Sequence, residues 1–310
     1  MTIAMAAITD EDHIVTVSDR LVSFANYVQG MDGAVLKARQ ISHAWGVLFA
    51  ATNGDLCVPL SNILAGLMYD VADPTRNFSL SEVKDFCRRG YQELFNAEFS
   101  SQYLSRYRFD DIAEFRTDGL ASLGTEKFHQ LCEALDSFDI GVSIVVYGHS
   151  IDGTAHVFKV VNPGSIVDND LLGVSVAGLG QFIAMGSLAV GLQKGRSLEA
   201  TIYRMLEAKF ASEAASDVGR HTAVMTFRKD GTYSDMPIEE IAELRNIWER
   251  EQRTPIDPAA LEIVRKSRAV TRIIEPEQPP LPLGEPENTI APPISVVPDQ
   301  IAPPPSDPGQ

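Results

Sequence analysis

Cysteine and basic residues are scarce in this sequence, and each scarcity excludes a class of protein. The 310 residues include three widely separated cysteines that form no CxxC motif, namely Cys57, Cys87 and Cys132. A disulfide framework is therefore not indicated, and we expect buried free thiols in a reducing compartment. Acidic residues outnumber basic ones by 42 to 26, which gives a net charge of −16. This charge argues against a nucleic-acid-binding groove and against binding to an anionic membrane.

Targeting and membrane signals are also weak. Met1–Ile14 lacks the basic start and the cleavage-site pattern of a secretory signal peptide, so we expect a cytoplasmic protein. Leu171–Leu192 carries no charge and is long enough to be considered as a membrane span, but glycines at 173, 178, 180, 186 and 191 interrupt it. We expect a buried strand at Val174–Ala177 and a buried helix at Phe182–Leu192 instead.

Proline, rare in the first part of the chain, dominates its end. From Glu275 onward the composition leaves almost no helix or sheet potential. We therefore expect residues 271–310 to form a disordered, proline-rich, polyproline-like tail. Pro279–Pro282 meets the loose PxxP pattern of docking peptides, a pattern that is common.

The N-terminus carries a candidate nucleophile. Removal of Met1 would leave Thr2 with both a hydroxyl and a free α-amine, a self-contained nucleophile and base. An α-amine titrates near ~8, close to working pH, as a general base should. A lysine ammonium beside it would favour the neutral amine, and a carboxylate would hold that lysine in place. Asp19 and Lys37 are the candidates for these two roles.

The surrounding pattern predicts a strand-rich N-terminus. Ile3–Ile8 and Ile14–Val17 are apolar runs joined by an acidic turn, which indicates a hairpin whose second strand ends at Asp19. Trp45–Ala51 is a further apolar run, and it stops at a Thr-Asn-Gly-Asp sequence where a helix can begin. Neighbouring strands would bring Thr2, Asp19 and Lys37 together, an arrangement that spacing alone does not predict.

These segments resemble the β-type subunits of the proteasome family, including the bacterial HslV-type peptidase. In that family the N-terminal threonine is the nucleophile, and the resemblance implies that Asp19 and Lys37 complete the catalytic group. Lys37 stands four residues before Ile41 and eighteen before Asp55, as the family pattern requires. A misplaced insertion would instead put Val35 at the lysine position and leave the site inactive. The matching runs are Thr2, Ser18-Asp19-Arg20-Leu21-Val22-Ser23, Leu36-Lys37-Ala38-Arg39-Gln40-Ile41 and Ala50-Ala51-Thr52-Asn53-Gly54-Asp55.

The rest of the chain alternates pairs of helices with pairs of strands. We expect helices at Val58–Tyr69, after the capping box Ser79–Glu82, at Glu126–Leu135 and at Ser197–Glu213, and strands at Gly141–Tyr147, Ala155–Val161 and Thr222–Arg228. On the helix at Ser197–Glu213, we place Lys209 off the apolar face. The resemblance implies an α+β fold: a four-layer αββα sandwich of the N-terminal-nucleophile (Ntn) hydrolases over residues 1–235. A helical insertion around 97–139 and C-terminal helices at 236–270 complete the domain organisation.

Several later positions depart from the family pattern. Gly178-Leu179-Gly180 stands where the family has Gly-Ser-Gly, so Leu179 replaces a supporting hydroxyl. Asp217 matches the family's later aspartate, but Arg220 and His221 replace part of the Ser-Gly-Gly stretch behind it. Ala51 occupies an oxyanion position usually held by glycine. A backbone N–H survives that change, so Ala51 remains the candidate oxyanion donor.

Metal and phosphate chemistry are weakly indicated. His149 and His156 lie on neighbouring predicted strands, but no third ligand stands at a suitable spacing, so we expect neither metal nor cofactor. Gly178-Leu179-Gly180 lacks the further glycines and the Lys-Ser/Thr pair of a phosphate-binding loop.

The resemblance implies a threonine-type endopeptidase that acts on peptides or unfolded proteins within a homo-oligomeric ring or related assembly. An ATPase regulator is a partner suggested by analogy alone, and no nucleic-acid or membrane partner is expected. Two alternatives stay open. One is a catalytically inactive relative that keeps the sandwich for assembly or binding, and the other is a small-molecule amide hydrolase of the same class.

Overall fold

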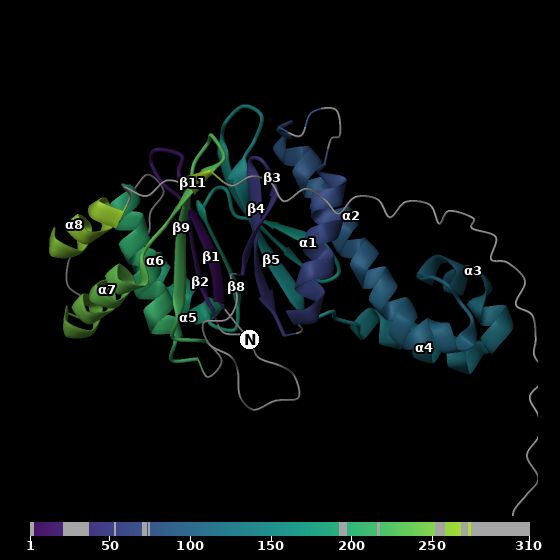
Figure 1. Ribbon diagram of the computed structural model, residues 1–310. Helices are drawn as coiled ribbons and strands as arrows, with labels where there is room; N and C mark the ends of the chain where they lie inside the picture. The colour runs from purple at the N-terminus through teal and green to yellow at the C-terminus, as the bar shows by residue number, and fades with distance from the viewer. Residues whose placement is uncertain are drawn as a thin grey trace, which may run out of the picture. The chain divides into compact units, whose positions relative to one another are not determined.

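Two antiparallel sheets form the centre of the protein in the computed structural model (Figure 1). The structure describes residues 3–20, 37–52, 54–69, 73, 75–191, 197–215, 218–251, 258–267 and 272–273. The first sheet has the strand order β11-β10-β9-β2-β1-β8, and the second has the order β3-β4-β5-β6-β7. The first sheet contains β1 (Ile3–Ile8), β2 (Ile14–Asp19), β8 (Val174–Gly178), β9 (Thr222–Phe227), β10 (Thr232–Asp235) and β11 (Arg272–Ile273). The second contains β3 (Ala38–Ser42), β4 (Trp45–Ala51), β5 (Val142–His149), β6 (Ala155–Val161) and β7 (Ser165–Asp168).

The predicted N-terminal hairpin is confirmed by the pairing of β1 with β2, in which Ala4 lies opposite Ser18. All six residues of β1 are buried, since β1 lies inside its sheet between β2 and β8. Successive side chains of a strand point to opposite faces. Ile3 and Met5 therefore pack among helices, whereas Ala4 and Ala6 face the second sheet.

One hydrophobic cluster joins the two sheets. It contains mostly small or β-branched side chains from β1, β4, β5, β6 and β8, together with the larger Leu48 and Tyr147. The apolar residues of these strands that face this cluster are Ala4, Ala6, Ile8, Leu48, Ala50, Val145, Tyr147, Ala155, Val157 and Ala177. The sheets therefore pack face to face, and each keeps one further face for helices.

Helices cover those remaining faces. On the second sheet, α1 (Cys57–Leu67) and α2 (Leu80–Phe99) share a core with β4, β5 and β6. The predicted capping box is confirmed, because the Ser79 side chain accepts from the Glu82 amide and Glu82 accepts from the Ser79 amide. On the first sheet lie α5 (Gln181–Gly191), α6 (Leu198–Ser212) and α7 (Ile238–Glu251), and α8 (Pro258–Ser267) packs on α6 and α7.

The region predicted as a helical insertion continues α2 through a π-helical turn, η2 (Ser100–Leu104), into α3 (Ile112–Leu123) and α4 (Thr125–Ser137). Its aromatic side chains extend the core that α1 and α2 share with the second sheet. Phe99 stacks on Tyr103, and both rings contact Phe138 edge-on. Phe115 is fully buried. These rings therefore support the insertion from inside.

The prediction of a buried helix at Phe182–Leu192 is wrong in part. Helix α5 buries Ala184 and Leu188, but Phe182 is 80% exposed and Ile183 is 41% exposed. These two side chains are exposed because α5 lies at the edge of its sheet. It packs on the edge strand β8 and on α6, and its other face is left open. Among the described residues, no helix combines the length and apolarity needed to cross a membrane.

The C-terminal region divides at residue 277. Helices α7 and α8 both contact α6 and belong to the unit Met1–Glu277. Strand β11, inside the segment predicted as the start of the tail, pairs with β10. The rest of the predicted tail, residues 274–310, lies outside the described residues.

Candidate functional site

Asp19, the last residue of β2, is fully buried and accepts hydrogen bonds from groups far apart in the sequence. Its Oδ1 accepts from Lys37 Nζ over 2.8 Å and from the backbone N–H of Ile3 over 2.9 Å. Its Oδ2 accepts from the N–H of Gly219 over 3.2 Å. The Lys37 side chain is only 10% exposed. A buried carboxylate is stable only when it is paired and hydrogen-bonded, and these donors meet that requirement.

Strand pairing explains this convergence. In the β2–β9 ladder, Asp19 lies opposite Thr222, which places the preceding Gly219 near its side chain. Ile3 begins β1, the other neighbour of β2. Lys37 belongs to the second sheet, because its carbonyl oxygen accepts from the N–H of Phe49 over 3.0 Å. The Asp19–Lys37 ion pair therefore joins the two sheets at one end.

Lys209 on α6 fixes the loop that contains Gly219, and the expectation that it lies off the apolar face is wrong. Its side chain is fully buried, and Nζ donates to the carbonyl oxygens of Gly219 and Arg220 over 2.7 and 3.1 Å. It also forms an ion pair with Glu213. Burial lowers the pKa of Lys209 to about 8. Helical spacing could have revealed this position, since residue 209 follows Ile202 by seven residues and so shares its face.

The remaining predicted site residues fall into two groups. Thr2 and Asp217 lie outside the described residues, as does Val35, the alternative to Lys37. Ala51 ends β4, opposite Val142 of β5. The N–H of Phe49 points towards Lys37, and amides two residues apart on a strand point the same way. The N–H of Ala51 is therefore directed to the edge of β4 that carries Lys37.

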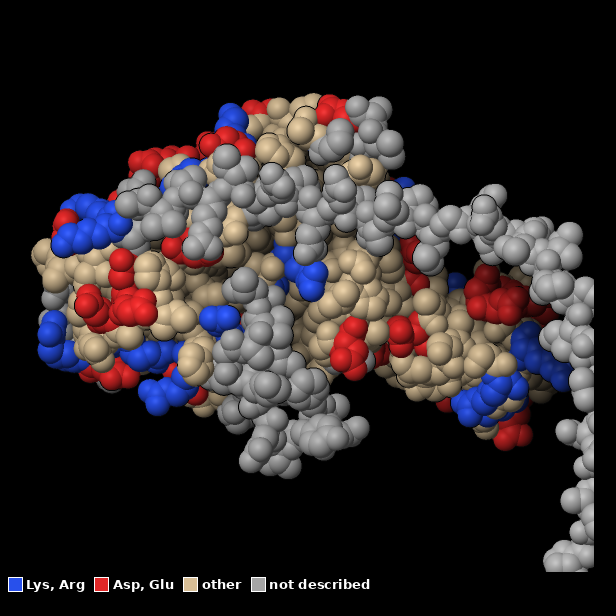
Figure 2. Space-filling view, in the orientation of Figure 1, with Lys and Arg blue, Asp and Glu red and all other residues tan. Residues whose placement is uncertain are grey.

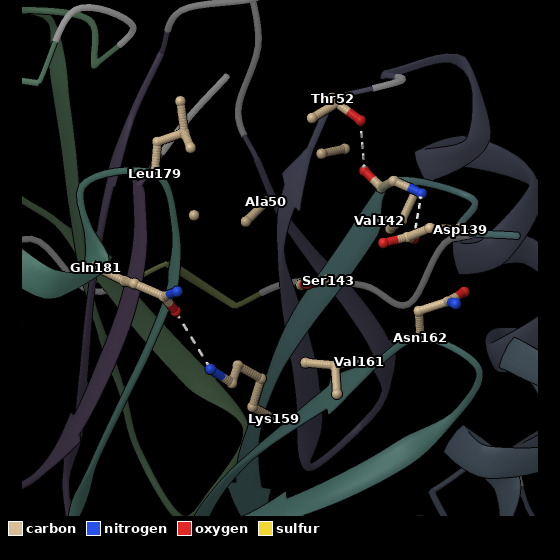
Figure 3. Close-up of a pocket in the computed structure, with 13 residues that line it drawn as sticks. Ala50, Thr52, Asp139, Val142, Ser143, Lys159, Val161, Asn162, Leu179 and Gln181 are labelled. Atoms are coloured by element: carbon tan, nitrogen blue, oxygen red, sulfur yellow. Dashed lines mark hydrogen bonds between the residues drawn. The ribbon is translucent and has the colours of Figure 1, made fainter. Parts of the chain in front are cut away.

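A cavity of about 400 Å³ opens beside Ala51 (Figure 3). Lys159 reaches it from β6 and donates to Gln181 Oε1 over 3.3 Å, and burial lowers the pKa of Lys159. Leu179, which is 49% exposed, also lines it. The lining residues, which come from the ends of β4, β5, β6 and β8, are Ala50, Ala51, Thr52, Asp139, Gly141, Val142, Ser143, Lys159, Val161, Asn162, Gly178, Leu179 and Gln181. Ala51 and Lys159 thus line the same cavity.

A second polar cluster has the composition of a catalytic triad. Ser150 Oγ lies 3.0 Å from His156 Nε2, and His156 Nδ1 lies 2.7 Å from Asp170 Oδ2. However, Ser150 is only 3% exposed, and its hydroxyl donates to Asp152 over 2.5 Å. Asp170 also accepts from the N–H of Val157. The cluster therefore ties the β5–β6 turn to the loop before β8, and its hydroxyl is not presented to a substrate.

Thiol and metal chemistry receive little support from the described residues. The three cysteines are free and lie in helices, as predicted, but only Cys87 is buried, whereas Cys57 and Cys132 are half-buried. Burial raises the pKa of Cys57 to about 11 and that of Cys87 to about 12, so neither is a thiolate at neutral pH. Within the described ranges, no three His, Cys, Asp or Glu side chains are grouped to hold a metal ion. His149, one of the two histidines considered for a metal, instead lies 2.7 Å from the carbonyl oxygen of Asp12.

On the face shown in Figure 2, acidic and basic side chains both occur, in small groups among other residues. No model of a known protein family matches this sequence, and a search of curated proteins found no significant match. The functional assignment therefore depends on the residues and their geometry.

Proposed function

We propose that this chain is an N-terminal threonine hydrolase of the proteasome β type that cleaves peptide bonds. One observation carries the proposal: Asp19 Oδ1 accepts both from Lys37 Nζ and from the N–H of Ile3. That N–H belongs to the amide through which the chain continues to Thr2. The same carboxylate oxygen therefore ties a buried lysine to the residue that follows the candidate nucleophile.

The proposed reaction uses the free amine of Thr2 as its base. That amine takes the hydroxyl proton through a water molecule, and Oγ attacks the peptide carbonyl carbon. The Lys37 ammonium stabilises the developing negative charge on Oγ, while Asp19 holds Lys37 in place. The Ala51 N–H stabilises the oxyanion. The Thr2 ammonium then protonates the leaving amine, the C–N bond breaks, and water hydrolyses the resulting ester to release the acid and restore Thr2.

The packing of the helices supports the finer fold assignment, a four-layer αββα sandwich of the Ntn-hydrolase type. Helices α1 and α2 share a core with the second sheet, and α5 to α8 share one with the first. The inter-sheet cluster separates these two cores. By analogy with the family, we further propose a homo-oligomeric assembly that confines the active sites, with an ATPase regulator as a candidate partner.

Leu179 favours a second candidate function, that of a catalytically inactive relative which binds peptides or supports an assembly. The resemblance places a serine hydroxyl at this position, whereas Leu179 presents an apolar side chain at the cavity. A site without that hydroxyl has one donor fewer to stabilise the reacting threonine. The inactive relative keeps the Asp19–Lys37 pair as a structural link between the sheets.

Peptide hydrolysis by matched variants tests the proposal. Intact-mass measurement first establishes whether Met1 is removed, since retention of Met1 excludes the mechanism. Thr2→Ala should abolish hydrolysis of a peptide panel, and Lys37→Met should lower it by at least about 100-fold. Lys127→Met, which removes a half-buried lysine from α4, should leave it unchanged. Hydrolysis that persists in Thr2→Ala would contradict the proposal, and a preference for small amides over every peptide would support the small-molecule alternative.

A further inference from the structure

Lys159 places a cation in the cavity without an acidic partner among the described residues. Its side chain extends from β6 towards Gln181 at the start of α5 (Figure 3). Lys159 Nζ donates a hydrogen bond to the neutral Oε1 of Gln181 over 3.3 Å. No carboxylate within the described ranges lies close enough to Lys159 to form an ion pair. A half-buried ammonium that is bound only to a neutral amide retains part of its desolvation cost. A ligand carboxylate would remove that cost.

Gln181 adds neutral donors at the same end of the cavity. Because its Oε1 accepts from Lys159, its side-chain NH₂ group remains available to donate. The Lys159 ammonium carries two further protons beyond the one given to Gln181. A carboxylate that enters here can accept from both residues, which is the pattern expected of a charge-assisted anion site.

The other end of the cavity has the opposite charge. The Asp139 carboxylate accepts from the N–H of Gly141 over 2.7 Å, near Thr52 at the end of β4. Figure 3 shows Lys159 and Asp139 on opposite sides of the cavity, with Val161 and Ser143 between them. An anionic group is therefore attracted to the Lys159 end and repelled from the Asp139 end, so its position is defined.

We infer that this cavity is a specificity subsite that binds an acidic side chain of a peptide substrate through Lys159 and Gln181. The inference rests on the proposed function, because it treats the peptide bound beside Ala51 as the substrate. Ala51 and Lys159 line one cavity, so a peptide carbonyl at Ala51 and a side chain at Lys159 can belong to one bound peptide. A volume of about 400 Å³ lies within the usual range of ligand sites, roughly 300–1,000 Å³.

Binding to the full-length Thr2→Ala protein tests the inference without any need for catalysis. The probes are fluorescent hexapeptides, blocked at both ends, in which each position in turn is Glu or Gln. At one position we expect Glu to bind about tenfold more tightly than Gln, as measured by fluorescence anisotropy. Adding Lys159→Met should reduce that ratio to about one, whereas adding Lys127→Met should leave it unchanged. Adding Lys159→Glu should favour a Lys-containing peptide at the same position.

Three outcomes would overturn the inference. The first is a panel in which no position prefers Glu, including one in which every peptide binds weakly. The second is a preference that survives Lys159→Met. The third is a Gln peptide with a free C-terminal carboxylate that binds as tightly as the preferred blocked Glu peptide. That result would assign the site to the C-terminus of a peptide. A Lys159-dependent preference in a protein whose wild type cleaves no peptide would support the binding site and reject the hydrolase, so the two failures are distinguishable.

Discussion

Lys209 donates a hydrogen bond to the carbonyl oxygen of Gly219 over 2.7 Å, and the N–H of the same glycine binds Asp19. A buried lysine on α6 thus fixes the peptide that helps to hold the candidate catalytic carboxylate. Glu213 neutralises this lysine, and Arg245 also binds Glu213 through two hydrogen bonds of 2.7 Å. The network extends from the helix layer to the end of β2.

Replacement of Lys209 tests this support. Lys209→Met removes the donor to Gly219 but leaves Glu213 paired with Arg245. We expect the free energy of unfolding, measured by urea denaturation, to fall by about 2 kcal/mol, less than the ~3–5 kcal/mol typical when a buried pair is broken without a substitute partner. Lys127→Met should change it by less than about 0.5 kcal/mol. An unchanged stability in Lys209→Met would contradict a structural role for this lysine.

The lowered pKa of Lys209 predicts a pH dependence. Burial lowers the pKa of Lys209 from its ordinary value of 10.5 to about 8, so between these two pH values the unfolded chain binds more protons than the folded one. Stability therefore rises with pH in this window, by up to about 1.4 kcal/mol per pH unit from this group. The measurement is the difference in unfolding free energy between wild type and Lys209→Met at pH 8, 9 and 10. If the unfolding free energy of the wild type falls relative to that of Lys209→Met as the pH rises, the lowered pKa of Lys209 is rejected.

The Asp19–Lys37 pair should show strong coupling. Asp19→Asn removes the carboxylate that pairs with a buried ammonium, and Lys37→Met removes the ammonium that pairs with a buried carboxylate. We expect each change to cost about 3 kcal/mol of unfolding free energy and the double variant to cost much less than the sum. A double-mutant cycle in urea measures the coupling. Additive effects would show that the two side chains do not depend on each other.

Leu179 offers a gain-of-function test. Leu179→Ser places a hydroxyl where the resemblance expects one, and a hydrogen bond to the charged reacting centre is worth at least about 1.4 kcal/mol, or about tenfold in rate. We therefore expect peptide hydrolysis to increase about tenfold. Leu171→Ser, at a residue that is 94% exposed, is the matched control and should not change the rate. A decrease in Leu179→Ser to the level of Thr2→Ala would refute a supporting role for that hydroxyl.

The N-terminal hairpin and the start of α2 follow from patterns visible in the sequence, whereas the meeting of Asp19 with Lys37 is implied by the resemblance to the proteasome family and not by spacing. Ile3–Ile8 and Ile14–Val17 are apolar runs on either side of a polar turn, and a hairpin of that length places the end of β2 beside the start of β1. Capping chemistry likewise identifies the start of α2, because Ser79 and Glu82 interact over one helical turn. The hairpin and the helix cap each depend on residues that are close together in the chain, so both can be predicted from the sequence alone.

The features that sequence reasoning missed depend on tertiary context. Helical spacing places Lys209 on the apolar face of α6, but the fold alone brings up the partners that satisfy its buried ammonium, namely Glu213 and the carbonyl oxygens of Gly219 and Arg220. The exposure of Phe182 depends on the position of α5 at a sheet edge. The role of Lys159 requires knowledge that the ends of β4, β6 and β8 meet at one cavity.

The central claim is tested most directly by an electrophile that reacts with N-terminal threonine, such as an epoxyketone or a β-lactone. The account predicts that wild type, purified without Met1, gains the mass of one inhibitor, that tandem mass spectrometry maps the adduct to Thr2, and that Lys37→Met forms it at least about 100-fold more slowly. Absence of an adduct on a protein that lacks Met1, or equal labelling of wild type and Lys37→Met, would contradict the threonine-hydrolase assignment.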